Sequence, residues 1–192
     1  ELLKKFTTMS VSYQYKDAVI KASPFFDERP DESAVSVLVI HNISLPPGQF
    51  GTKGIEQLFT GTLDPEEHPF YAEIAHLRVS AHCVIRRDGT VEQYVPFNKR
   101  AWHAGLSSFQ GQEKCNDFAI GIELEGTDEQ PYTEAQYQSL EAVSAQIISL
   151  YPAITLGRIV GHNDIAPGRK TDPGVAFNWA GYRQALSQHI KR

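Results

Sequence analysis

Several features are scarce in this chain of 192 residues, and each scarcity excludes a class of protein. Two cysteines, Cys83 and Cys115, are too few for a disulfide scaffold. No apolar run approaches the roughly 18 residues that a membrane-spanning helix needs. The formal net charge of −5 provides no basic excess for binding nucleic-acid phosphates. We therefore expect neither a membrane nor a nucleic acid as a partner.

The composition that is present fits a globular protein. Hydrophobic residues make up 41% of the chain and charged residues 21%, and the length is sufficient for one domain with a full core. Cys83 lies in an apolar run and is expected to be a small, buried core residue. A single disulfide between Cys83 and Cys115 stays open as an alternative.

The N-terminal segment, ELLKKFTTMSVSYQYK, does not have the composition of a signal peptide. It has neither an apolar segment of roughly 7–15 residues nor a small-residue cleavage site. The only methionine is Met9, so we expect residues 1–8 to be a tag remnant or an upstream extension. Without an export signal, the expected location is the cytoplasm. We expect residues 1–25 to be a lead-in to a single domain over residues 26–192, acting as a monomer.

Strand-like and helix-like segments alternate along the chain, which predicts an α/β (α+β) fold with a central mixed sheet flanked by helices. The apolar run over 34–40 ends at His41 and is typical of a central strand. Asp88-Gly89 between two β-rich runs predicts a hairpin over 79–95. The other expected segments are an irregular region at 10–34, a short helix at 54–60, a loop at 61–73, strands at 118–125 and 158–161, and a last helix at 178–190.

A long helix is expected to begin after Thr133. Thr133 as N-cap and Gln136 three residues later form a capping-box pattern. Apolar side chains then recur at helical spacing and are expected to face the core. They are Tyr137, Leu140, Val143, Ile147 and Leu150.

The segment RIVGHNDIAPGRKTDPG, at 158–174, carries two candidate metal ligands, His162 and Asp172. His41 follows another apolar strand, and strand ends are where reactive groups of a sheet collect. If the two strands are neighbours, the three side chains can converge. Two histidines and one carboxylate form a known hydrolytic zinc set, with water at the fourth position. The alternative is a structural histidine and an aspartate that forms a turn.

Two further side chains are candidates for the chemistry of such a site. Glu123 lies at the end of an apolar strand and could serve as general base and later as proton donor, with Glu125 as the competing residue. Lys170 could stabilise an oxyanion, or it could be a solvated loop residue. His82 and His103 are expected to hydrogen-bond inside the fold or to line the cleft. Neither a G-x-S-x-G elbow nor an HExxH motif is present.

Six ordered motifs between about residues 26 and 179 resemble the AmpD-type N-acetylmuramoyl-L-alanine amidases. They are VIHNISLPPGQFG at 39–51, LFTGTLDP at 58–65, HLRVSAHCVIRRDG at 76–89, KRAWHAG at 99–105, CNDFAIGIELEGTD at 115–128 and GHNDIAPGRKTDPG at 161–174. The resemblance implies the amidase-2 and peptidoglycan-recognition-protein fold, with a zinc cleft. The implied reaction is hydrolysis of the lactyl–L-alanine amide of 1,6-anhydro-muropeptides in cell-wall recycling.

The resemblance also implies roles for individual residues. His41, His162 and Asp172 would bind Zn²⁺, Glu123 would be the acid/base residue, and Lys170 would stabilise the oxyanion. Three further residues match positions that line the substrate cleft in the family: Asn42, Arg78 and Trp102. Lys114 stands where the family leads us to expect an arginine, and lysine keeps the charge but loses the bidentate fork. Two alternatives stay open, namely a wall-degrading amidase that acts on polymeric murein and a peptidoglycan-binding module without catalysis.

Overall fold

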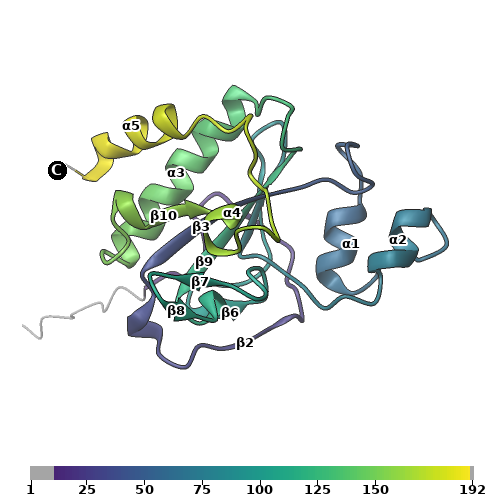
Figure 1. Cartoon of the computed structure of the whole chain (residues 1–192), viewed down its shortest axis with the longest axis horizontal. Coiled ribbons are helices and arrows are strands. Elements are labelled where there is room, and N and C mark those ends of the chain that lie inside the picture. Colours follow the sequence, from purple (N-terminus) through teal and green to yellow (C-terminus); the bar gives the residue numbers. More distant parts are fainter. Residues whose placement is uncertain (1–10, 191–192) are drawn as a thin grey trace, which may run out of the picture.

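A six-stranded mixed sheet forms the centre of the fold (Figure 1). The structure is a computed structural model that describes residues 11–190, so the prediction for residues 1–8 lies outside the described residues. The hairpin strands are antiparallel, and all other neighbouring strands are parallel. The strand order is β1 (Val19–Ile20), β5 (Val91–Gln93), β4 (Cys83–Ile85), β9 (Ala119–Glu125), β3 (Val37–Ile43) and β10 (Ile159–Gly161). The predicted mixed sheet, its hairpin and the interior position of the strand bearing His41 are confirmed.

Helices cover both faces of this sheet (Figure 1). On one face lie α3 (Glu134–Leu150) and α5 (Trp179–Ile190), which pack on each other and on the main core. On the other face, α1 (Gly54–Thr60) and α2 (Pro69–Ile74) form a smaller core with Val84. The remaining elements are the strand pairs β2 (Phe26–Glu28) with β6 (Lys99–Ala101) and β7 (Ser108–Phe109) with β8 (Gln112–Glu113), the short helix α4 (His162–Ile165), and the 3-10 helices η1 (Glu32–Ala34), η2 (Cys115–Asp117) and η3 (Leu156–Arg158).

The capping box of α3 is present as predicted. The Thr133 side chain accepts from the Gln136 N–H, and the Gln136 side chain accepts from the Thr133 N–H. The predicted apolar stripe contacts the main core, with Leu140 fully buried. Cys83 and Cys115 are both buried and free, so the disulfide alternative is wrong.

The alternation of side chains along the strands decides which face carries the chemistry. In β3, Leu38 and Ile40 point into the core beneath α3, and Val39 points to the opposite face. His41 follows Val39 by two positions and therefore shares its face. Glu123 is the direct register partner of His41 on β9. The two side chains consequently emerge together on the face that α3 leaves free.

Three expectations about local structure are wrong. The strand that carries His41 does not end there but continues to Ile43, because β9 pairs with it to its end. The expected loop at 61–73 contains the start of α2, with Pro69 in its first turn. The expected irregular region at 10–34 contains β1, which joins the sheet beside β5, as well as β2 and η1. Within residues 11–190, no helix combines the length and apolar character needed to cross a bilayer.

Candidate metal centre and catalytic cleft

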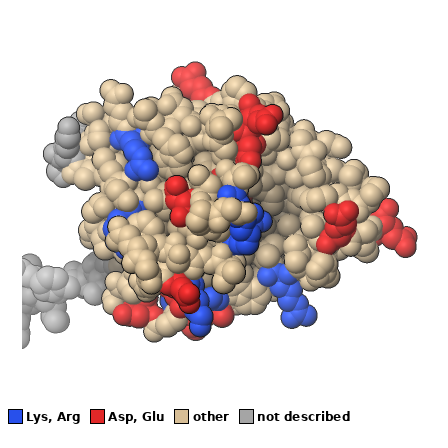
Figure 2. All heavy atoms as spheres, in the orientation of Figure 1, with Lys and Arg blue, Asp and Glu red and all other residues tan. Residues whose placement is uncertain are grey.

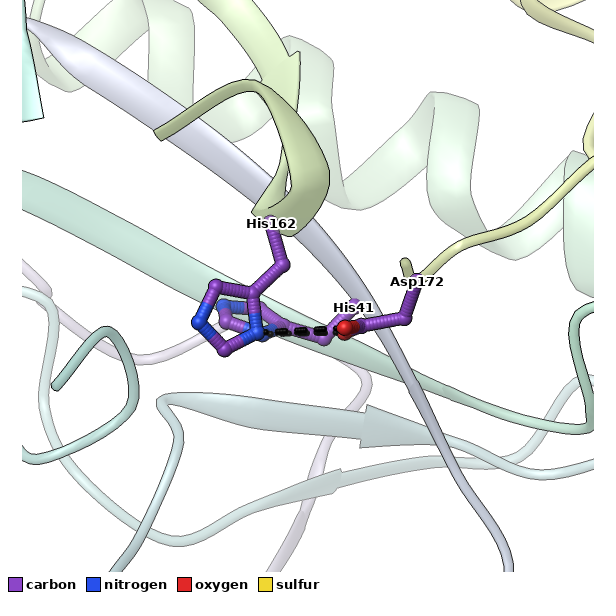
Figure 3. Close-up of side chains that lie close together, drawn as sticks. All are labelled: His41, His162 and Asp172. Carbon is purple, nitrogen blue, oxygen red and sulfur yellow. Dashed lines mark hydrogen bonds and ion pairs between the residues drawn. The ribbon is translucent and has the colours of Figure 1, made fainter. Parts of the chain in front are cut away.

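His41, His162 and Asp172 converge from three segments of the chain (Figure 3). His41 comes from β3, and His162 is the first residue of α4, directly after β10. Because β3 and β10 are neighbouring parallel strands, the two imidazoles reach the same point. Asp172 comes from the loop after α4, where its backbone carbonyl accepts from the Asn163 N–H at 3.0 Å. The structure therefore brings the three predicted metal ligands together.

The geometry and chemistry of this trio suit a zinc ion. The Nδ1 atoms of His41 and His162 lie 2.9 Å apart, and they lie 3.4 Å and 3.3 Å from Asp172 carboxylate oxygens. Ligand atoms about 2.0–2.2 Å from zinc in a tetrahedron are separated by roughly 3.3–3.6 Å, which matches the two distances to Asp172 and exceeds the distance between the two imidazole nitrogens. The candidate ligand atoms all lie within 4.8 Å of one another. The residues present thus fit a bound Zn²⁺.

The electrostatics of the trio also favour a cation. Burial lowers the pKa of His41 to about 4, which keeps the imidazole neutral at pH 7. Burial alone would raise the pKa of Asp172, but its hydrogen bonds with His162 and His41 outweigh burial and hold the pKa well below the usual range. A neutral imidazole at His41 and an ionised carboxylate at Asp172 are the protonation states that a metal requires of such ligands.

Glu123 lies beside this trio, with Oε1 3.8 Å from His41 Nδ1. Its other oxygen, Oε2, is buried and has no hydrogen-bond partner among the residues that the structure describes. Burial, followed by the charge of Asp172, raises the pKa of Glu123 well above its usual range, while Lys170 acts in the opposite direction. A carboxyl group with these properties can both accept and return a proton.

Glu125, the competing carboxylate, is committed to the fold. It is 2% exposed, Arg86 donates to it at 3.0 Å, and the backbone N–H groups of Gly51 and Arg87 donate to it at 2.9 and 3.2 Å. These partners occupy its carboxylate, and it does not line the cleft that Glu123 lines beside the candidate metal ligands.

The cleft above the trio encloses about 230 Å³ and has two unlike walls. Figure 2 shows this face hollowed between the body of the domain and the α1–α2 segment, with charges of both signs interspersed around it. The polar wall holds the metal-ligand candidates His162 and Asp172 together with Glu123, Lys170 and His103. The apolar wall consists of Ile43, Leu58, Phe59, Leu77, Val79 and Trp102. A ligand with a polar reacting group and an apolar face would match this division.

The four residues assigned to the substrate cleft do not all reach it. Asn42 and Trp102 line it, although the Asn42 amide donates to Asp128 and Tyr132, and the Trp102 indole donates to Asp27. Arg78 and Lys114 are exposed and do not line this cavity. Contact of these two with a substrate stays a prediction.

His103 hydrogen-bonds inside the fold and lines the cleft, as predicted. His103 is buried, and its Nδ1 lies 2.9 Å from Nε2 of His41, so it directly supports a metal-ligand candidate. Its ring packs against Gly121, where a Cβ would lie only 2.5 Å from the imidazole. In the sequence, the only indication that His103 belongs to the site is its place in the AWHAG segment, directly after a short strand. The supporting contact joins segments 62 residues apart and is not visible in the sequence.

The Amidase_2 family, described as N-acetylmuramoyl-L-alanine amidase, matches residues 31–175. The chain belongs to this amidase family. It is 64% identical over 166 residues to the 1,6-anhydro-N-acetylmuramyl-L-alanine amidase AmpD of Escherichia coli K12, covering 86% of this chain and 90% of that protein. As an Amidase_2 member, the chain is an N-acetylmuramoyl-L-alanine amidase, which confirms the resemblance drawn from its motifs.

Solved structures of amidases share its fold. A crystal structure of a selenomethionine derivative of AmpD aligns with a TM-score of 0.89 at 60% identity and covers 92% of this chain and 98% of that one. The E. coli amidase AmiD, solved with its substrate anhydro-N-acetylmuramic acid-L-Ala-D-gamma-Glu-L-Lys, aligns with a TM-score of 0.59 at 32% identity. That alignment covers 79% of this chain and 57% of the AmiD chain.

Proposed function

We propose that this amidase is zinc-dependent and hydrolyses the amide between the lactyl group and L-alanine in soluble 1,6-anhydro-muropeptides, as a step of cell-wall recycling. The observation that carries the proposal is the convergence of His41, His162 and Asp172 beside the unpaired carboxylate oxygen of Glu123. The substrate assignment is supported by the 64% identity to AmpD, and by the anhydro-N-acetylmuramic acid peptide that the relative AmiD holds as its substrate.

The proposed chemistry divides between the metal and the chain. Bound zinc would supply a Lewis acid for the carbonyl oxygen and lower the pKa of a water molecule toward about 7. Glu123 accepts a proton from the attacking water through Oε2 and then returns it to the leaving alanine nitrogen. Lys170 presents its ammonium to the carbonyl oxygen as negative charge develops there.

The walls of the cleft would orient the substrate. The apolar wall around Trp102 and Leu77 offers a surface for the less polar face of the sugar, and the metal-ligand side faces the amide. Fixing the amide near both Glu123 and the ligands would supply part of the rate enhancement through orientation alone. The cytoplasmic location, the monomeric state and the contacts of Arg78 and Lys114 stay predictions.

A cleavage assay on zinc-loaded protein tests the proposal. Anhydro-muramyl tripeptide and intact murein sacculi are offered separately, and products are read by mass spectrometry. We expect free tripeptide from the small substrate only, loss of the reaction on chelation, and recovery when zinc is restored. Cleavage of sacculi would instead favour a wall-degrading amidase. Cleavage that survives complete removal of metal would overturn the zinc assignment.

A further inference from the structure

The segment His103–Ala104 contacts both candidate metal-ligand histidines on the side away from the metal. The Nε2 atom of His41 lies 2.9 Å from Nδ1 of His103. The Nε2 atom of His162 lies 3.0 Å from the carbonyl oxygen of Ala104. Two successive residues of one loop therefore hold the outer nitrogens of both imidazoles.

These contacts fix which nitrogen of each ring carries the proton. The Ala104 carbonyl oxygen can only accept, so His162 must carry its proton on Nε2 and present the lone pair of Nδ1 to the metal. For His41 to present Nδ1 in the same way, its Nε2–H must donate to Nδ1 of His103. The orientation of the His103–Ala104 segment consequently determines whether both lone pairs aim at one point.

Asn116, in η2, holds that segment in place. Its side-chain Oδ1 accepts from the backbone N–H of His103 at 3.1 Å and from that of Ala104 at 2.8 Å. Because both partners are donors, the atom between them must be the amide oxygen. Asn116 is 8% exposed, so water cannot readily replace these two bonds.

The contacts of His103 favour a functional reason for this arrangement. Its Nε2 is buried and has no hydrogen-bond partner within residues 11–190. A buried ring nitrogen without a partner is unfavourable for folding. An apolar side chain of similar size would avoid that penalty but would offer no acceptor to His41.

We propose that Asn116 is a positioning residue for both metal-ligating histidines and acts through the two backbone N–H groups of His103 and Ala104. This inference rests on the proposed zinc-dependent function. Loss of the Asn116 oxygen leaves the two backbone N–H groups unpaired and lets the segment shift, while Arg169 still donates to the Ala104 carbonyl at 2.7 Å. The partners of the outer nitrogens of His41 and His162 are then no longer held in fixed positions. Both histidines then spend part of the time in tautomers or orientations that cannot bind the ion.

The test compares zinc affinities, measured by competition with a chromophoric chelator. Asn116→Leu removes the acceptor at similar volume, and Asn116→Asp retains an acceptor oxygen. Removing a partner that orients a metal ligand typically weakens metal binding by about 10–100-fold, and we expect Asn116→Leu to fall in that range. Asn116→Asp should lie within a few-fold of the unsubstituted protein.

Ser107→Ala is the matched control. Ser107 is buried in the same loop, where its hydroxyl donates to the Gly105 carbonyl and accepts from the Cys115 N–H, and no hydrogen bond joins its side chain to His103 or Ala104. Its loss should lower the unfolding midpoint of the metal-free protein and leave zinc affinity unchanged. Zinc affinity of Asn116→Leu equal to that of the unsubstituted protein would overturn the inference.

Nitrogen-15 NMR of the histidine rings gives a second readout that needs neither metal nor activity. The metal-free, unsubstituted protein should show His162 protonated on Nε2, and Asn116→Leu should show a mixture of tautomers. A predominantly Nδ1-protonated His162 in the unsubstituted protein would overturn the inference even if no variant folds. If the unsubstituted protein binds no zinc, the proposed function fails and this inference fails with it. If it binds zinc and cleaves while the Asn116 variants match it, only this inference fails.

Discussion

His41 and Glu123 are direct register partners on the parallel strands β3 and β9, with His41 Nδ1 3.8 Å from Glu123 Oε1. This pairing ties the candidate base to a candidate metal ligand through the backbone of the sheet. A slip of one residue in the register would turn Glu123 to the opposite face. The site therefore depends on the same strand pairing that builds the core.

Replacing Glu123 with glutamine should separate proton transfer from metal binding. The variant keeps the shape of the side chain but can no longer accept a proton, so we expect turnover to fall by about 10²–10⁴-fold. Zinc affinity should change little, because Glu123 is not among the three converging ligands. Release of tripeptide and zinc content are measured on the same sample. Near-normal turnover with zinc bound would assign the proton transfer to another group.

Glu125→Gln should show the opposite behaviour. Glu125 is buried and accepts from Arg86 and from the Gly51 N–H, so loss of its charge weakens a buried network. We expect the free energy of unfolding to fall by about 1–3 kcal/mol, as for other buried hydrogen bonds to charged groups. Turnover per folded molecule should stay close to normal. Denaturant unfolding and the cleavage assay together check this, and a selective loss of turnover would make Glu125 the better candidate for the base.

The sequence carried enough local information to predict the strands and helices that position the site. Apolar runs predicted β3 and β9, and the capping pattern at Thr133 predicted α3, because these signals depend on neighbouring residues. The helix α2 was missed because its N-cap is His68, whose ring nitrogen accepts from the Phe70 N–H, and histidine is not among the usual capping residues.

The convergence of the candidate metal ligands was predictable because His41 and His162 each follow an apolar run in the sequence and Asp172 lies in the same loop as His162. The supporting contacts were not predictable. His103 meets His41 and Asn116 meets His103 only after the sheet and the η2 segment have packed together. No periodicity or spacing in the sequence records such a contact, since its partners lie on separate elements.

Lys170→Ala tests the oxyanion assignment. Lys170 lines the polar wall of the cleft, and its backbone N–H is fixed by the Ala166 carbonyl at 3.0 Å. By analogy with the loss of one oxyanion donor, turnover should fall by about 10²–10³-fold. Lys170→Arg should recover part of it because the charge is retained. The control is Lys16→Ala, at an exposed lysine of the N-terminal segment, and equal rates for Lys16→Ala and Lys170→Ala would make Lys170 a solvated loop residue.

His82→Gln should change how stability depends on pH. His82 is fully buried, with its Nδ1 accepting from the Gly121 N–H and its Nε2 donating to the Lys99 carbonyl. Burial, followed by the positive charge of Arg29, lowers the pKa of His82 to about 3. In the unfolded chain the pKa of histidine is about 6.5. Between about pH 3 and pH 6.5, the folded state therefore binds a proton at His82 less readily than the unfolded state does.

The sign of the effect follows from this difference. The stability that His82 contributes is complete above about pH 6.5 and declines as the pH falls toward 3, because only the unfolded chain takes up the proton. Between pH 7 and pH 5 this decline amounts to about 2 kcal/mol. The destabilisation caused by His82→Gln should therefore be about 2 kcal/mol smaller at pH 5 than at pH 7. Urea unfolding at pH 5 and pH 7, in the presence of chelator, measures the destabilisation at each pH. The control is His76→Gln, which removes an exposed imidazole. An equal destabilisation at the two pH values would show that His82 titrates alike in the folded and unfolded states.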